Sequence, residues 1–379
     1  MLPAAIAINA LLGVLYGWSL FLSPIEAQLL VSRTVLSFVP AMGLLCFTLG
    51  VLVHNLLIPR LQIGILAPGV VATAGLGHFL FWLFPSYIGL LLGYGVVFGT
   101  TAGIGYGLAL AMARQSSPTV RGWAVGVTVA AFAASGMAIS ALGAIFQIQE
   151  DVPRLFGFIG AVFCISAMAL ASVLRRATLA YDSSIKLNVP NTTIPVFPLL
   201  YLALGYFALC YPGLVFVSHG AAILQASGAS DPASSIAPFI LNAGYIAGAL
   251  LGGFLPSCLP GRGAPLVLLI ATTTCVGLMK MPLPIPFHVL AMFGIGVGLG
   301  SVVSVFFLLL SHKYNPDRAS ALFARLNISY GLAGISAPTI TGRLYDLTGG
   351  SDATLWFTFF VGIVGLIAIS NTAAARSIT

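Results

Sequence analysis

The sequence predicts an all-α membrane protein with 12 transmembrane helices in two six-helix bundles, with both the N- and the C-terminus in the cytoplasm. Three observations support this prediction. Of 379 residues, 59% are hydrophobic and only 6% are charged, whereas a soluble domain carries roughly a quarter charged residues. Apolar runs of about 20 residues, the length that crosses a bilayer, recur along the chain. One long polar break divides these runs into two groups of six.

The apolar runs follow one another along the chain with polar connections between them. The sequence is apolar from Leu2 onward and its first basic residue is Arg33, so we expect a membrane helix there and not a cleaved signal peptide. The twelve runs cover residues 3–24, 34–58, 63–84, 87–113, 121–147, 155–174, 197–224, 233–257, 264–282, 286–311, 319–343 and 354–373.

The longest polar break runs from Arg175 to Pro195 and has the composition of a linker. We therefore expect an N-terminal six-helix bundle at 1–176, a cytoplasmic linker at 177–195 and a C-terminal six-helix bundle at 196–379.

The two halves also resemble each other, because each has a glycine-rich stretch followed by a Pro and an Arg at the next cytoplasmic turn. These features are 93–99 with Pro118 and Arg121, and 294–300 with Pro316 and Arg318. Duplicated halves joined by a long loop are the layout of major facilitator transporters, which bind their solute between the halves.

The positions of Lys and Arg predict the orientation, because these residues concentrate in the cytoplasmic loops of membrane proteins. With the N-terminus inside, the residues on the outer side are Arg33, Arg154, Lys280 and Arg343. Those on the cytoplasmic side are Arg60, Arg114, Arg121, Arg175, Arg176, Lys186, Arg262, Lys313, Arg318 and Arg376. The net charge of +7 therefore reflects topology and gives no argument for binding nucleic acid.

Several motifs occur in the order seen in one group of transporters. They are the segments 9–24, 32–37, 118–126, 213–220 and 333–346. Together they resemble the first, second, fourth-to-fifth, seventh and eleventh helices of the oxalate-formate antiporter and monocarboxylate transporter families. The resemblance implies a monomeric carrier that moves a small organic anion by proton symport or anion exchange, without a cofactor.

Three departures from that family bear on the solute. The loop at 50–60 lacks the usual Asp and most of the usual basic residues, and the segment 232–258 has no Lys or Arg. Arg325 also precedes the family's usual position in the eleventh helix, which aligns near Tyr330. A monoanion, or a less charged solute, is therefore favoured over a dicarboxylate held by two cations.

Arg325 is the Lys or Arg that we expect inside a membrane helix rather than near an end. At about 1.5 Å per residue it lies roughly 10 Å along the helix from Arg318. A charge at that depth suggests a functional site, and Arg325 could bind a carboxylate through two parallel hydrogen bonds. Ser329 and Ser336 follow on the same face. The alternative is that the guanidinium of Arg325 extends back to the cytoplasmic surface.

Aromatic and titratable side chains complete the predicted solute site. Tyr16, Trp18, Tyr211 and Tyr330 could form its walls, although ordinary helix packing is the simpler role for each. His219 could bind the solute or couple protons, or could be a hydrogen-bonded packing residue.

Three charged residues are further candidates outside the solute site. Glu26 is a candidate for proton coupling or a solvated acid at the membrane interface. Arg121 and Arg318 are candidates for a cytoplasmic gate, besides their ordinary role as topology signals.

The sequence also bears on classes of function other than transport. The chain has no HExxH, no GxxxxGK[ST] and no paired intramembrane carboxylates, which argues against an intramembrane enzyme, and we expect no metal or cofactor. A transporter-like receptor is a further alternative. Among carriers, the alternative to an organic-anion transporter is an exporter of a larger amphipathic drug, siderophore or metabolite. We expect the bacterial cytoplasmic (inner) membrane as the location.

Overall fold

The computed structural model describes residues 1–58, 60–117, 120–146, 151–175, 196–259, 261–314 and 316–372. The predicted linker at 177–195 lies outside these residues, as do Arg176, Lys186 and Arg376. Every regular element in the described residues is a helix, which confirms the all-α prediction. The limits of the two predicted bundles stay a prediction.

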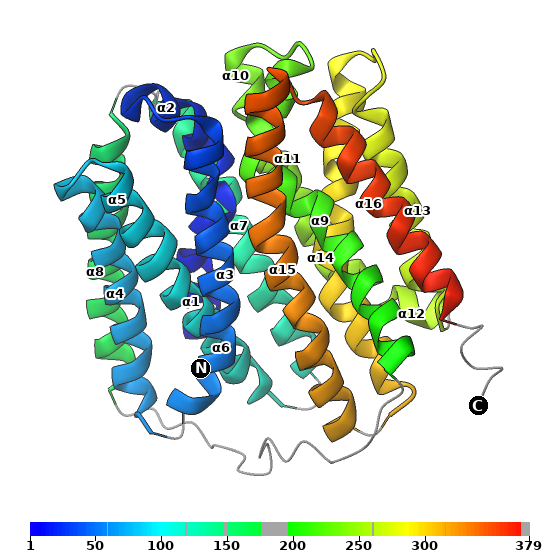
Figure 1. Ribbon diagram of the computed structural model, residues 1–379. Coiled ribbons are helices and arrows are strands. Elements are labelled where there is room, and N and C mark those ends of the chain that lie inside the picture. The colour runs from blue at the N-terminus through cyan, green and yellow to red at the C-terminus, as the bar shows by residue number, and fades with distance from the viewer. Residues whose placement is uncertain are drawn as a thin grey trace.

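The first half of the chain contains helices on the left of Figure 1. They are α1 (Leu2–Leu12), η1 (Gly13–Gly17), α2 (Ser19–Leu29), α3 (Arg33–Leu57), α4 (Ile63–Leu83), α5 (Tyr87–Leu90), η2 (Leu91–Phe98), α6 (Gly99–Arg114), α7 (Arg121–Phe146) and α8 (Val152–Leu174).

The second half lies on the right of the same view. Its helices are α9 (Val196–Ala226), α10 (Asp231–Ser234), α11 (Ala237–Leu251), α12 (Leu255–Cys258), α13 (Gly263–Leu278), α14 (Ile285–Ser311), α15 (Pro316–Thr348) and α16 (Asp352–Asn371).

Each predicted apolar run coincides with one helix or with consecutive helical segments. Among the described residues, eight helices are long and apolar enough to cross a membrane, or nine when the bent pair of α1–η1 and α2 counts as one span. Two further apolar helices, α11 and α13, have only 15 and 16 residues. The number of twelve transmembrane helices therefore stays a prediction.

The first span is bent by 52° between Leu2–Gly17 and Ser19–Leu29. At the bend, η1 lies directly against α7, since a Cβ on Gly13 would come 1.7 Å from the carbonyl oxygen of Phe132. The glycine therefore permits a close backbone approach, and the tighter 3-10 turn that follows it carries Tyr16.

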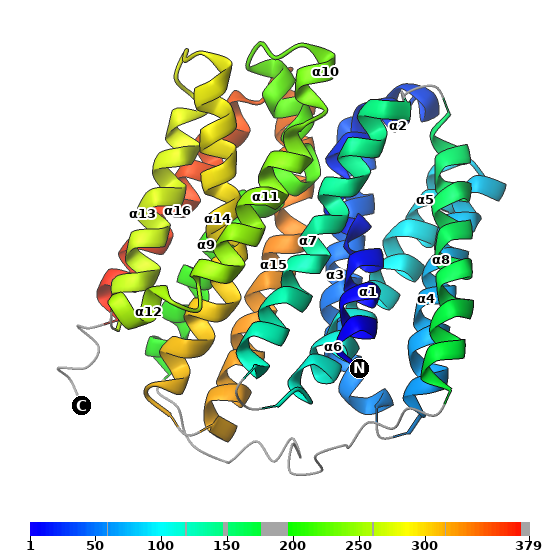
Figure 2. The same cartoon turned by 180° about the vertical axis from the view of Figure 1, so that it is seen from behind.

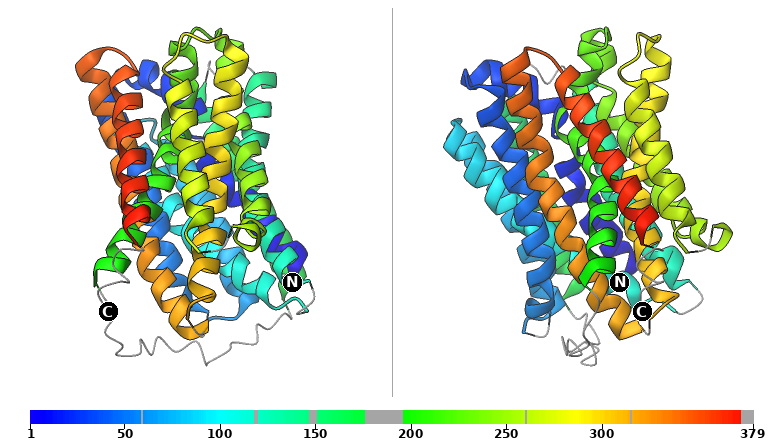
Figure 3. Two further views of the ribbon diagram at one scale, coloured as in Figure 1. Left: turned by 90° about the vertical axis from the view of Figure 1, so that its right-hand side faces the viewer. Right: turned by 45° about the vertical axis from the view of Figure 1, so that its right-hand side comes forward.

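We call the end of the bundle that carries α2, α5 and α10 the upper end, as in Figure 1, and the opposite end the lower end. The helix α1 begins and α16 ends at the lower end (Figures 1 and 3). The loops that carry Arg60, Arg262 and Lys313 connect helices at this end as well.

Two pairs of helices make the most extensive contacts between the halves. In Figure 1, α3 lies beside α15, and the view from behind in Figure 2 shows α7 beside α11. Glycines on α15 allow the first pair to pack closely. A Cβ on Gly334 would lie 2.8 Å from the Cβ of Leu44, and one on Gly342 would lie 2.3 Å from the Oγ of Ser37. Small residues at such contacts are typical of packed membrane helices.

Candidate functional site

A hydrogen bond between two tyrosines joins the halves near the middle of the bundle. The hydroxyl of Tyr16, on η1, lies 2.7 Å from the hydroxyl of Tyr330, on α15. Both residues are buried, with exposed fractions of 4% and 8%. The structure thus brings together two of the residues that the sequence indicated, although they are 314 positions apart.

Aromatic rings surround this bond and come from both halves. Tyr16 makes edge-to-face contacts with Phe132 on α7, at 5.1 Å between ring centroids, and with Tyr245 on α11, at 5.5 Å. Phe47 on α3 lies 6.2 Å from Tyr330. Such ring pairs stabilise by about 1 kcal/mol beyond the burial of their area.

Three more tyrosines lie close enough to interact electrostatically with this pair. We call the five residues the tyrosine cluster, which consists of Tyr16, Tyr106, Tyr206, Tyr245 and Tyr330.

Two asparagines add amide groups to the tyrosine cluster. The Nδ2 of Asn242 donates to the carbonyl oxygens of Pro238, at 2.7 Å, and of Tyr16, at 3.3 Å. The Oδ1 of Asn242 is buried and has no hydrogen-bond partner among the described residues. The hydroxyl of Tyr206 donates to the Oδ1 of Asn327 at 3.2 Å. The cluster therefore contains an unused buried acceptor, which a solute or a water molecule could satisfy.

The tyrosine cluster is mostly uncharged. Within the described part of the chain, its five members make no ion pair or hydrogen bond with Lys, Arg, Asp or Glu. Arg114, at the lower end of α6, interacts electrostatically with Tyr106 and with His54. Arg114 is therefore the described cation best placed to approach the cluster from below.

Arg325 is exposed and lies on the outer face of α15. Residues three and seven positions further along a helix share its direction, and these are Ile328 and Leu332, with exposed fractions of 54% and 57%. Tyr330, by contrast, points from a different face into the cluster. The structure thus does not bring Arg325 to the tyrosine cluster, which supports the alternative that its guanidinium extends to the surface. Ser329 is buried beside Tyr330.

Trp18 and Tyr211 lie inside separate halves. The ring of Trp18 packs 5.0 Å from that of Tyr94 on η2, and Tyr211 lies 5.4 Å from Phe207 on its own helix and 5.9 Å from Phe357 on α16. Among the described residues, neither ring packs against a ring of the tyrosine cluster. Their burial, at 0% and 1% exposure, reflects the cores of the two halves.

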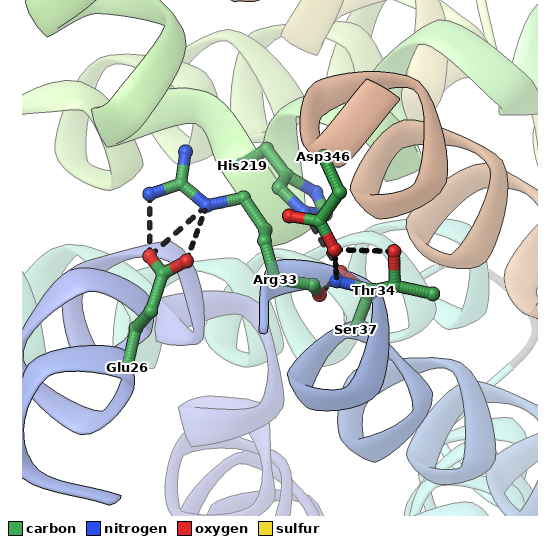
Figure 4. A network of polar contacts seen from close by, with 6 residues as sticks. All are labelled: Glu26, Arg33, Thr34, Ser37, His219 and Asp346. Atoms are coloured by element: carbon green, nitrogen blue, oxygen red, sulfur yellow. Dashed lines mark hydrogen bonds and ion pairs between the residues drawn. The ribbon is translucent and has the colours of Figure 1, made fainter. Parts of the chain in front are cut away.

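A second set of polar contacts joins the halves at the upper end (Figure 4). The side chain of Arg33, at the start of α3, bonds to the carboxylate of Glu26 on α2, with 2.5 Å between Nη2 and Oε2. Its guanidinium also lies 3.7 Å from the centre of the Tyr345 ring on α15. Arg33 is only 7% exposed, so its contacts with Glu26 and Tyr345 must compensate for the free-energy cost of burying its charge.

The neighbouring residues of α3 reach the other half directly (Figure 4). The backbone N–H and the hydroxyl of Thr34 both donate to Oδ2 of Asp346 on α15, at 2.8 and 2.5 Å. Partial burial raises the pKa of Asp346, but the hydrogen bonds from Thr34 and Ser32 outweigh it and hold the pKa below its usual value. The Oγ of Ser37 lies 3.0 Å from Nε2 of His219 on α9.

We call this set of contacts the upper network, which consists of Glu26, Arg33, Thr34, Ser37, His219, Tyr345 and Asp346. It contains both residues that the sequence suggested for proton coupling, Glu26 and His219. It also contains Arg33, which the sequence indicated only as a residue of the outer side.

The two predicted gate residues, Arg121 and Arg318, both lie on helices at the lower end. The guanidinium of Arg318 lies 4.8 Å from the ring centre of Tyr314 at the lower end. Arg121 begins α7 there, but its side chain lies outside the described part of the structure.

Some residues of the interface were not among the predicted site residues. Asn242 and Tyr245 share the short apolar helix α11, and a polar amide in such a helix is a signal that could have indicated them. Tyr106 and Tyr206 gave no such signal, because aromatic residues are common in packed helices.

No family model and no curated protein matches the chain. Solved structures do match it. The nucleoside transporter NupG has a TM-score of 0.76 at 13% identity, over 98% of each chain. A bacterial homologue of the human lysosomal transporter Spinster, inward-facing and occupied, has a TM-score of 0.71 at 18% identity, over 99% of this chain and 96% of that one. The same homologue, unoccupied, has a TM-score of 0.70 at 16% identity, over 98% and 95%.

These likenesses cover nearly the whole chain and both of its halves. They do not support the narrower resemblance to oxalate-formate antiporters and monocarboxylate transporters, which stays a prediction. The apolar helices indicate an integral membrane protein, and the chain shares the fold of these transporters.

Proposed function

We propose that the chain is a secondary active transporter that moves a small solute along the interface between its halves by alternating access. The single observation that carries this proposal is the tyrosine cluster, where hydroxyls, amides and aromatic rings from both halves meet. The similar structures are transporters and not enzymes, which supports the proposal. A solute bound there would contact both halves and so depend on their relative position.

We further propose a monomer with twelve transmembrane helices and both termini in the cytoplasm, in the bacterial inner membrane. The lower end would be cytoplasmic, because the loops and helix ends there carry the positive charges Arg60, Arg114, Arg175, Arg262 and Lys313. With that orientation, the upper network closes the path on the outer side.

Two solute classes are proposed, each from its own observation. An amphipathic compound with rings and hydrogen-bonding groups suits the cluster itself, because its members are aromatic and uncharged. A small organic anion such as a monocarboxylate, moved by proton symport or anion exchange, is the second class. Arg114 supports it, since that cation could hold a carboxylate beside Tyr106. Arg325 is not assigned to either site.

The first experiment measures the thermal stability of the purified protein with a panel of monocarboxylates and of amphipathic aromatic compounds. A ligand at about 100 times its dissociation constant stabilises the native state by about 2.7 kcal/mol. The variants are Tyr330→Phe, Arg114→Gln and Arg325→Gln. We expect a stabilising compound to lose most of its effect with Tyr330→Phe.

The arginine variants separate the two solute classes. A monocarboxylate that stabilises wild type should fail with Arg114→Gln, whereas an amphipathic compound should keep its effect. Arg325→Gln is the matched control and should keep the response and the stability of wild type to within about 0.5 kcal/mol. If ligand stabilisation were lost in Arg325→Gln but kept in Tyr330→Phe and Arg114→Gln, the assignment of the solute site to the tyrosine cluster would be wrong. Compounds that stabilise the protein are then tested for flux into liposomes, and absence of flux would contradict transport.

A further inference from the structure

The hydrogen bonds of Ser37 define which ring nitrogen of His219 carries the proton. The Oγ of Ser37 donates its single hydrogen to the carbonyl oxygen of Arg33, at 2.7 Å. It can therefore only accept from the Nε2 of His219, at 3.0 Å. The imidazole is thus protonated on Nε2, and its Nδ1 carries the free lone pair.

The Nδ1 of His219 is the place where a second proton would bind. This atom is buried and has no hydrogen-bond partner among the described residues, and the whole side chain is only 2% exposed. A proton on Nδ1 would create a charged donor without an acceptor in a site that excludes water. Such a group is strongly unfavourable.

The charges around His219 also oppose a second proton in the closed network. Arg33 on α3 acts electrostatically on the imidazole. The acids nearby are already used, because Glu26 on α2 bonds to Arg33 and Asp346 on α15 accepts from Thr34. Like charges in a buried site repel each other with little screening.

The other helices that pack against α9 offer no described carboxylate to the imidazole. On α16, Asp352 pairs with Lys280 at 2.6 Å, and on α14 His288 lies 3.1 Å from the carbonyl oxygen of Met281. Arg343 on α15 is exposed and adds positive charge. The side chain of Asp231 on α10 lies outside the described part, and α11 carries no acid, Lys, Arg or His.

We infer that His219 is a proton-binding site that controls the upper end: the closed upper network holds it neutral, and uptake of a proton on Nδ1 separates α9 from α3. This inference rests on the proposed function, because it requires an upper end that opens. In water an imidazole takes a proton at about pH 6.5. Since the proton binds better to the open form, lowering the pH must favour opening by the same coupling.

The experiment is a distance measurement by pulsed EPR between spin labels on the two halves. The labels replace Ile88 and Leu347, which are 59% and 65% exposed near the upper end, and the five free cysteines are replaced first. In lipid nanodiscs, we expect two distances between the labels, a shorter one for the closed form and a longer one for the open form. The fraction of molecules with the longer distance should increase as the pH falls from 8 to 5. The open-to-closed ratio should rise by up to about tenfold per pH unit, the limit for one proton.

A matched pair of variants assigns the response to His219. His219→Gln keeps an amide that can donate to Ser37 but cannot take up a proton, so it should remain closed throughout this pH range. His288→Gln is the control, because His288 is also a buried histidine at the upper end but bonds within its own half. It should behave as wild type.

Two results would overturn the inference. One is a wild-type distance that does not change with pH, which decides the matter even if His219→Gln fails to fold. The other is a folded His219→Gln protein that still opens at low pH. These outcomes are independent of solute flux: a pH-dependent opening without flux would contradict only the proposed transport, and flux without pH-dependent opening would contradict only the role of His219.

Discussion

The upper network and the tyrosine cluster join the same two halves by different chemistry. At the upper end, two hydrogen bonds from Thr34 to the carboxylate of Asp346 and the contact of the Arg33 guanidinium with the Tyr345 ring cross between the halves. In the middle, two neutral hydroxyls, those of Tyr16 and Tyr330, lie 2.7 Å apart among aromatic rings. The charged contact is stronger and more demanding in its geometry than the neutral one.

This difference suggests a division of roles. Separating the halves would take Tyr345 away from the guanidinium of Arg33 and Thr34 away from the carboxylate of Asp346, so the upper network favours either a fully formed contact or a fully hydrated, separated one. A neutral hydroxyl can exchange one hydrogen-bond partner for another at a cost of about 1 kcal/mol or less. The upper network is therefore suited to a gate, and the tyrosine cluster to a solute that replaces contacts between the halves.

The largest expected effect comes from removing the charge of Glu26. In Glu26→Gln, the 7% exposed Arg33 keeps its charge without a carboxylate partner. We expect a loss of about 3 kcal/mol, at the low end of the range for broken buried pairs because Glu26 is partly exposed. The measurement is the free energy of unfolding in detergent.

An exposed ion pair at the same end gives the control. Lys280 pairs with Asp352 at 2.6 Å, and the side chain of Asp352 is 83% exposed. Asp352→Asn should therefore cost less than about 1 kcal/mol. If Glu26→Gln and Asp352→Asn lowered the free energy of unfolding by the same amount, the Arg33–Glu26 pair would contribute no more than an exposed ion pair, which would contradict this prediction.

An intermediate effect is expected for the hydroxyls of the tyrosine cluster. Tyr16→Phe or Tyr330→Phe alone removes this hydrogen bond while the other hydroxyl stays buried, and should cost about 1–2 kcal/mol. The double variant should cost less than the sum, because neither hydroxyl then remains. A double-mutant cycle measures this coupling, and additivity within about 0.5 kcal/mol would show that the two hydroxyls do not interact.

The smallest effect concerns the pH dependence through Asp346. Hydrogen bonds hold its pKa below the unfolded value, which is about 3.9. Its contribution to stability is therefore present above that value and is lost as the pH falls through the lower folded pKa. Wild type should lose stability on acidification below about pH 4 more steeply than Asp346→Asn, as measured by thermal unfolding at each pH. Identical curves would show that Thr34 does not stabilise the carboxylate.

Part of the candidate site could be predicted from local sequence. Tyr16 and Tyr330 were indicated because each places an aromatic ring with a hydroxyl group in a predicted membrane helix. His219 was indicated because an imidazole titrates near neutral pH, and Glu26 because it is an acid just beyond the end of the first apolar run. Their assembly could not be predicted, since it depends on contacts between residues 182 and 314 positions apart.

The choice between two roles for Arg325 shows a limit of the same reasoning. Its depth along the helix follows from residue counting, but the direction of its face depends on which neighbours cover α15. In the structure α3 and α9 cover other faces, and Arg325 shares the exposed side with Ile328 and Leu332. Arg33 shows the reverse case: its position at a helix start suggested a surface charge, but packing by α2 and α15 buries it.

The sequence by itself determined the all-α membrane architecture and the places where helices begin, because runs of apolar residues and their polar breaks are local properties that a bilayer-sized helix requires. Only the tertiary structure decided which polar side chains meet across the halves. The apolar helices can pack on several faces with similar burial, so hydrogen bonds and glycine contacts between distant segments select the arrangement that forms the tyrosine cluster and the upper network.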